Sequence, residues 1–240
     1  MYSKMPPVYL CCYASGPWIP AVPRVLREAH AMNVFTDIFI YGYTDLDVSF
    51  RHQHEVWMSS QRRGHGYWIW KPQVILQTLR RIPENAIVLY MDIGCSLIPS
   101  GIKRFNEYVE LVTAHPSGVL AFSLESIHPE ARWNKGDLLR LFDVDGDSLQ
   151  VLSGIEFMVN TPTVRRMVEQ WLTYMSNYHL IDDSPSILPN DPRFTEHRHD
   201  QSVWSLLVKT NKCLVIPDET YWYPTWDAPN YPIHSKRQRV

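Results

Sequence analysis

The sequence lacks any run of apolar residues long enough to cross a bilayer. Nowhere do about 18 apolar residues follow one another, the length at which a transmembrane helix becomes a candidate. The opening stretch, MYSKMPPVYLCCYASG, also lacks the apolar segment of a signal peptide, and no N-x-Ser/Thr sequon occurs. These absences predict a protein that has no membrane span and stays in the cytoplasm.

Paired cysteines and a strong net charge are missing as well. Of the four cysteines, Cys11 and Cys12 are adjacent and the other two stand alone, without metal-ligand spacing, so we expect buried free thiols. The formal net charge is −2 and the basic stretches are short. This pattern predicts no nucleic-acid binding.

Several common catalytic signatures are absent. Without G-x-G-x-x-G or a P-loop, dinucleotide and nucleoside-triphosphate chemistry through those motifs is excluded, and the lack of G-x-S-x-G weakens an esterase interpretation. DVDGDS, at 143–148, looks like a calcium loop, but its glycine comes too early and Gly154 occupies the twelfth position. We interpret this stretch as a hairpin turn.

The chain does contain alternating strand and helix patterns. Strands are expected at 8–14, 34–42, 86–94, 118–123, 149–161 and 213–217. Helices are expected up to residue 32 and at 72–79, 102–114, 137–142, 163–178 and 197–209, with an irregular polar segment before Gly66 and a long loop at 180–196. We therefore predict one α/β domain, residues 1–240, with a mostly parallel sheet and helices on both faces.

In such sheets, ligands bind beyond the carboxyl ends of the strands. The chemistry is therefore expected just after Ala14, just after Tyr90 and around Gly154. Asp92 ends the apolar strand IVLYMDIG, where a carboxylate can hold a divalent cation or a ribose hydroxyl. The alternative is a simple capping or turn role for Asp92.

Two further stretches concentrate chemically active side chains. EHRHDQS, at 196–202, places two histidines and two acids at a helix start; its acids could serve only the helix dipole. Its H-x-H-D string is similar to hydrolytic metal sites, but no further ligands follow at zinc spacing. In HGYWIWKP, at 65–72, aromatic rings and a lysine stand at the mouth of a helix, either to plug the core or to face an anionic ligand.

Six blocks in order carry a resemblance to a known family. They are YASGPWIP, GYWIWKP, IVLYMDIGCSL, RWNKGDLL, EHRHDQSVWSLL and YPIHSKR. Together they resemble the GT-A glycosyltransferases of cell-surface and viral glycan synthesis, in the group marked by G-Y-W-x-W-K-P and D-x-G-C. The likeness runs from about Val8 to Arg237, nearly the whole chain.

The resemblance implies a metal-bound donor site with one departure from the family pattern. A strand-end aspartate there usually belongs to a D-x-D pair that binds the metal and the ribose, and Asp92 takes that place. Gly94 stands where the second acid would be. A divalent cation, Mn²⁺ or Mg²⁺, would need another ligand, with His234 and His199 as candidates.

The resemblance also implies a place for the rest of the donor. Without metal, Lys71, Lys236 and the helix start could neutralise the diphosphate. Trp68 and Trp70 would offer flat faces to a sugar or base. The nucleotide base would lie against the loop residues Tyr13, Ala14 and Ser15.

Three residues would serve the reaction itself. Asp200 and Gln201 match a D-Q element beside the reacting anomeric carbon, and Glu156 lies on a strand lining the acceptor side. Asp200 is the candidate base for an inverting reaction, with Glu156 second, and Gln201 would matter for a retaining one.

The resemblance therefore implies a glycosyltransferase, hexosyl or pentosyl, that moves a sugar from a nucleotide-sugar, expected to be UDP-linked, to a glycan acceptor. The alternatives are an inactive nucleotide-sugar or carbohydrate-binding protein, motivated by the missing second acid, and a metal-dependent hydrolase built on H-x-H-D.

Overall fold

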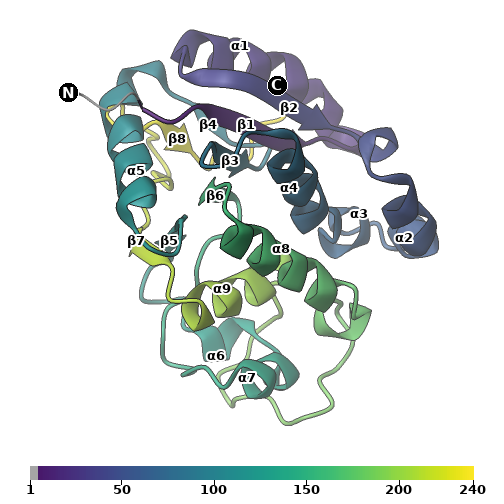
Figure 1. The fold of residues 1–240 in the computed structure, drawn as a ribbon. Coiled ribbons are helices and arrows are strands. Elements are labelled where there is room, and N and C mark those ends of the chain that lie inside the picture. The colour runs from purple at the N-terminus through teal and green to yellow at the C-terminus, as the bar shows by residue number, and fades with distance from the viewer. Residues whose placement is uncertain (1–4) are drawn as a thin grey trace.

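A central six-stranded sheet organises the chain. The structure, a computed structural model, describes residues 5–240, and its strands lie in the order β2–β1–β3–β6–β5–β7 (Figure 1). Their bounds are β1 (Val8–Tyr13), β2 (Phe35–Tyr41), β3 (Ile87–Met91), β5 (Val119–Ser123), β6 (Ile155–Val159) and β7 (Leu214–Pro217). β6 runs antiparallel to β3 and β5, while the other neighbouring pairs are parallel. The predicted mostly parallel α/β sheet is confirmed.

Helices cover both faces of this sheet. Along β1, Cys11 and Tyr13 enter one apolar core and Leu10 and Cys12 enter the other, as the period of two requires. The first core is closed by α4 (Trp70–Arg81), α8 (Pro162–Met175) and α9 (Asp200–Thr210), and the second by α1 (Val22–Met32) and α5 (Ile102–Ala114). All four cysteines are free and three are buried, as expected.

Shorter elements complete the chain. They are α2 (Val48–Ser60), α3 (Gly64–Tyr67), α6 (Glu130–Trp133), α7 (Gly136–Phe142), the 3-10 turns η1 (Gly16–Ala21), η2 (Tyr43–Asp45), η3 (Pro99–Gly101) and η4 (Tyr178–Leu180), and a two-stranded sheet of β4 (Ser96–Leu97) and β8 (Ile233–His234). No helix between residues 5 and 240 has the length and apolar character needed to span a membrane.

Two sequence predictions about these elements are wrong. Residues 48–60 form a helix instead of an irregular segment, because Phe50, His54 and Met58 recur every four residues and are buried on one side. Residues 149–161 are not one long strand, since only Ile155–Val159 pairs continuously. Just before it, the carbonyl of Ser153 accepts a hydrogen bond from a lysine side chain instead of from a strand.

Candidate active site

One edge of the sheet brings together two of the places where chemistry was expected. Because β6 runs opposite to β3, its first residue Ile155 pairs with Met91, the last residue of β3. The amide of Asp92 then donates to the carbonyl of Gly154 at 2.8 Å. A Cβ added at Gly154 would lie 3.1 Å from Oδ2 of Asp92. Gly154 therefore leaves room for this carboxylate.

Lys71 stands at the centre of the site. Its side chain comes from the first turn of α4 and is almost fully buried, with a residue exposure of 1%. The ammonium nitrogen lies 2.5 Å from Oδ2 of Asp200, 2.8 Å from the carbonyl oxygen of Ser153 and 3.4 Å from Oδ1 of Asp92. Burial alone would lower the pKa of Lys71, but the charges of Asp200 and Asp92 outweigh it and raise that pKa.

Lys71 is therefore a charged link between α9 and the end of β3. With its donors directed at Asp200, Ser153 and Asp92, its ammonium is occupied within the protein. The sequence led us to expect Lys71 to face a diphosphate. In the structure it positions carboxylates instead.

Asp92 and Asp200 differ sharply in exposure. The Asp200 side chain is 6% exposed and accepts on Oδ2 from both Lys71 and the hydroxyl of Ser153, the latter at 2.8 Å. The Asp92 side chain is 40% exposed and accepts from the hydroxyl of Tyr90 at 2.7 Å. Burial raises the pKa of Asp200, although Lys71 opposes the shift. Asp92 is thus the acid that a ligand meets first, and Asp200 is held firmly behind it.

Glu156 is shut off from any ligand. It is fully buried, pairs in register with Tyr90, and neither carboxyl oxygen finds a hydrogen-bond partner among residues 5–240. Burial raises its pKa well above the ordinary value. Instead of a second base, the structure gives a buried carboxyl group beside the charges of Lys71 and Asp200.

The segment before α9 holds His199 in a strained backbone. His199 has φ 55° and ψ −119°, a region that costs energy for any residue with a side chain. Its Nδ1 lies 2.7 Å from the carbonyl oxygen of Ile181, while its buried Nε2 has no hydrogen-bond partner in the described chain. Gln201, two residues on, donates from Nε2 to Oε1 of Gln150 at 2.7 Å.

The expected metal ligands do not gather around Asp92. Nε2 of His234 lies 3.1 Å from the carbonyl oxygen of Ala228. His199 directs Nδ1 at the carbonyl oxygen of Ile181, and its Nε2 lies 3.8 Å from Oδ1 of Asp183. Within residues 5–240, no three His, Cys, Asp or Glu side chains lie close enough to hold an ion. The donor set therefore does not fit a divalent cation held by several protein ligands.

The missing second acid has a physical reason. A Cβ added at Gly94 would lie 2.8 Å from the ring of Trp18 and 3.2 Å from Cα of Arg237. An aspartate could enter this position only if Trp18 or the segment around Arg237 moved.

The aromatic residues divide into packing and exposed roles. Trp70 is buried and stacks on Tyr13 with ring centroids 4.0 Å apart, and the hydroxyl of Tyr13 lies 2.9 Å from Nδ1 of His65. Trp68 is only half-buried and stacks on His199 with centroids 5.6 Å apart. Trp70 therefore plugs the core, whereas Trp68 remains available to a ligand.

The remaining predicted donor residues lie at the same edge of the sheet. Ala14 follows β1, is buried, and donates its amide to the carbonyl of Tyr41 at 2.9 Å, while Ser15 precedes η1. Lys236 is half-buried and follows β8, where its amide donates to the carbonyl of His234 at 2.9 Å.

Sequence reasoning missed Ser153 and Tyr90. Tyr90 could have been found, because it lies two residues before Asp92 and so points to the same side of the strand. Ser153 offers no such signal, since its contacts with Lys71 and Asp200 join segments far apart in sequence.

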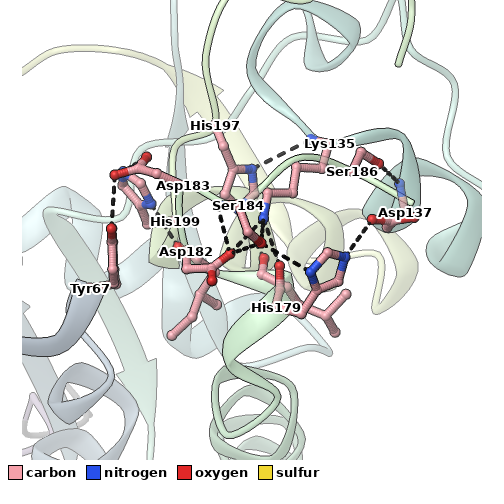
Figure 2. A network of polar contacts seen from close by, with 12 residues as sticks. Tyr67, Lys135, Asp137, His179, Asp182, Asp183, Ser184, Ser186, His197 and His199 are labelled. Carbon is pink, nitrogen blue, oxygen red and sulfur yellow. Dashed lines mark hydrogen bonds and ion pairs between the residues drawn. The ribbon is translucent and has the colours of Figure 1, made fainter. Parts of the chain in front are cut away.

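A second polar network fixes the long loop that leads to α9 (Figure 2). Nζ of Lys135 lies 2.8 Å from Oδ1 of Asp182 and 2.7 Å from the carbonyl oxygen of His179. Asp137 binds Nε2 of His179 at 2.8 Å, and the hydroxyl of Tyr67 donates to Asp183 at 2.9 Å. The loop is thus anchored on α7 and α3 before it delivers His199 and Asp200.

No protein-family model and no curated protein matches the sequence. Solved structures with a similar course of the chain include the galactosyltransferase LgtC in complex with donor and acceptor sugar analogs, at 12% identity and TM-score 0.47, covering 95% of this chain and 86% of that one. Another is a glycosyltransferase involved in glycosylation of the major capsid of PBCV-1, at 13% identity and TM-score 0.43, covering 90% and 95%.

A third is a 4-diphosphocytidyl-2C-methyl-D-erythritol synthase from Anaerococcus prevotii, at 9% identity and TM-score 0.41, covering 86% and 99%. These are proteins of more than one activity. At such identities and scores, the likeness concerns the fold alone.

Proposed function

We propose that the chain is a glycosyltransferase with a single GT-A domain over residues 1–240. It moves a sugar from a nucleotide-sugar, with UDP as the expected nucleotide, to a hydroxyl group of a glycan acceptor. The observation that carries the proposal is the cluster at the carboxyl edge of the sheet, where buried Lys71 joins the open carboxylate of Asp92 to the buried carboxylate of Asp200. The six-block resemblance supports the same reaction.

Each of the three residues has a part in this reaction. Asp92 binds hydroxyl groups of the donor, since its carboxylate faces solvent. Asp200 takes the proton of the acceptor hydroxyl, and the acceptor oxygen forms a bond to the anomeric carbon. The bond from that carbon to the diphosphate breaks, and its electron pair leaves with the nucleoside diphosphate, which needs no proton. Lys71 holds Asp200 in place and keeps it anionic until this step.

The stereochemistry and the cation stay predictions. A retaining enzyme would use Gln201 near the anomeric carbon instead of a base at Asp200. If Mn²⁺ or Mg²⁺ takes part, Asp92 is the acid that would hold it, and the ion would stabilise the departing diphosphate.

A second candidate function is a nucleotide-sugar or carbohydrate-binding protein without catalysis. The obstruction at Gly94 favours it, because no second acid can enter there without a shift of Trp18 or Arg237. A metal hydrolase has less support. In the H-x-H-D string, His197 and His199 lie 2.9 Å and 2.7 Å from the carbonyl oxygens of Leu180 and Ile181.

The test is transfer from a panel of UDP-sugars to a glycan library, measured as UDP release and product mass. We expect Asp92→Asn and Asp200→Asn each to lower kcat/KM by roughly a hundredfold or more, because each removes a charge used in the reaction. Asp37→Asn, at an exposed position on the edge strand β2, is the control and should behave as wild type.

Near-normal transfer by Asp200→Asn would contradict its role as base. Tight nucleotide-sugar binding by the wild-type protein without turnover on any acceptor would favour the binding protein instead.

A further inference from the structure

The segment Lys236–Val240 is fastened across the loop that follows Asp92. The amide of Gln238 donates to the carbonyl of Gly94 at 2.8 Å. The buried guanidinium of Arg24 donates to the carbonyl of Gln238 at 3.0 Å. Gln238 is therefore an anchor, and its neighbours are held over the loop.

Arg237, next to this anchor, lies against Gly94. Its Cα would lie 3.2 Å from a Cβ on Gly94, and its φ of 55° is left-handed, a conformation that persists only where surrounding contacts impose it. The side chain is exposed, and within residues 5–240 its guanidinium makes no hydrogen bond or ion pair. The backbone of Arg237 thus lies beside Gly94, two residues after Asp92, and its cation has no partner among the described residues.

Arg198 places a second cation at the start of α9. Its guanidinium lies 4.0 Å from the centre of the Trp133 ring and 3.1 Å from Oε1 of Glu196, while its buried Nε lacks a hydrogen-bond partner in the part of the chain described. Burial lowers the pKa of Arg198, and the charges of Arg237 and Arg63 lower it further against the pull of Glu196. Because Lys71 contacts both Asp200 and Asp92, the start of α9 and the loop around Gly94 lie at one site. Arg198 and Arg237 therefore approach this site from two different segments of the chain.

We propose that Arg198 and Arg237 together bind the diphosphate of the nucleotide-sugar, in place of a cation held by a D-x-D pair. The inference rests on the proposed function. Guanidinium groups match phosphate oxygens in pairs of parallel hydrogen bonds and stay charged at any physiological pH. Lys71 is engaged with carboxylates, and the room for a second acid is filled, so these arginines supply the charge that the departing diphosphate needs.

The experiment is calorimetric titration of the full chain with UDP and with uridine, in EDTA and in Mn²⁺. We expect wild-type protein to bind UDP in EDTA, with little gain from Mn²⁺. Arg198→Gln and Arg237→Gln should each weaken UDP binding by roughly tenfold to a hundredfold, the effect of losing a charge-assisted contact. Uridine binding should not change, because uridine carries no phosphate.

Two further variants sharpen the result. Arg198→Lys keeps the charge but loses the paired donors, so it should fall between wild type and Arg198→Gln. Arg80→Gln removes an exposed arginine that pairs with Glu169 near the far end of α4, and it should bind UDP as wild type does. Unfolding midpoints close to wild type would confirm that the variants fold.

Several outcomes would overturn the inference. UDP binding that disappears in EDTA would mean that a metal ion binds the diphosphate. Unchanged UDP binding in both glutamine variants would mean that the two arginines do not contact it. If the wild-type protein binds UDP and transfers sugar, and the arginine variants bind UDP equally well, only this inference is wrong. A wild-type protein that binds no nucleotide in either buffer sinks the proposed function as well.

Discussion

Glu156 places a carboxyl group in the core with no hydrogen-bond partner among the described residues. Its surroundings already hold the ammonium of Lys71 and the carboxylates of Asp92 and Asp200. A third negative charge there would face two others across a medium of low polarity. We therefore expect Glu156 to be neutral in the folded protein, which leaves Lys71 to balance Asp92 and Asp200.

Glu156→Gln tests this protonation state, because glutamine resembles a neutral carboxyl group. The folded-state pKa of Glu156 is raised above its ordinary 4.5, so the unfolded chain releases this proton first. Wild type must then lose stability as the pH rises above about 4.5, and the glutamine variant must lose less. In urea unfolding, we expect the free energy of unfolding of the variant to rise steadily relative to that of wild type from pH 4.5 to pH 8. A constant difference over that range would mean that Glu156 is ionised in the fold.

At the residue scale, the sequence singled out Asp92 and Asp200 as candidates but did not predict how they are related in the folded chain. Asp92 could be predicted because a carboxylate at the end of an apolar strand needs a reason to be there. The role of Lys71 could not, since its partner Asp200 is 129 residues away and only the folded chain brings them together. A lysine at the start of a helix, such as Lys71, predicts that a cation lies near an anion, but it does not predict which anion.

The turn Gly64–Trp68 is the most strained element next to the site. Its residues have positive φ throughout: 57° at Gly64, 52° at His65, 88° at Gly66, 56° at Tyr67 and 60° at Trp68. Two indole N–H groups hold it, because Trp57 donates to the carbonyl of Gly66 at 3.1 Å and Trp70 to that of Gly64 at 2.9 Å. The turn presents Trp68 to His199.

Gly64→Ala should destabilise the protein more than the positive φ of residue 64 alone predicts. A Cβ at Gly64 would lie 2.4 Å from the ring of Trp68, so the ring must leave its stack on His199. Gly16→Ala is the matched control, because Gly16 also has positive φ but open space around an added Cβ. We expect a loss in free energy of unfolding of about 1 kcal/mol for Gly16→Ala and at least about 2 kcal/mol for Gly64→Ala. Equal losses in urea titrations would contradict the contact with Trp68.

At the element scale, buried strands and amphipathic helices could be predicted, but their directions could not. Nothing within the apolar run that becomes β6 fixes the direction of the strand. Its antiparallel pairing with β3 is set by the connections around it. The helix α2 was missed because its surface is so polar that three buried residues in thirteen carry the pattern. A weak pattern of this kind gains meaning only against the surface it packs on.

Across the whole molecule, the site depends on a loop anchored far from it in sequence. Asp137, in the first turn of α7, accepts hydrogen bonds from the amides of Ile187 and Leu188 at 2.9 Å and 2.8 Å. It also binds His179 at 2.8 Å (Figure 2). The sequence predicted a long loop here and left its position open. No periodic pattern in the sequence predicts that Asp137 makes three contacts with residues more than 40 positions away.

Asp137→Asn should therefore destabilise the fold although it changes one atom. Burial alone would raise the pKa of Asp137, but the hydrogen bonds from Leu188, Ile187 and His179 hold it at about 2. We expect a loss of about 2 kcal/mol at pH 7, from weakened hydrogen bonds to a charged acceptor. Since the folded pKa lies below the ordinary 3.8, this loss should shrink as the pH falls from 3.8 toward 2.

The matched control for Asp137→Asn is Asp147→Asn. Asp147 likewise accepts a hydrogen bond from a side chain, that of Arg193 at 2.5 Å, but its own side chain is 74% exposed. Exposed ion pairs contribute about 0–1 kcal/mol because water and salt screen them, so urea unfolding should place Asp147→Asn close to wild type. Loss of transfer activity in Asp137→Asn alone would tie the anchored loop to the placement of Asp200. Two variants of equal stability would instead show that the contacts of Asp137 contribute no more than an exposed pair.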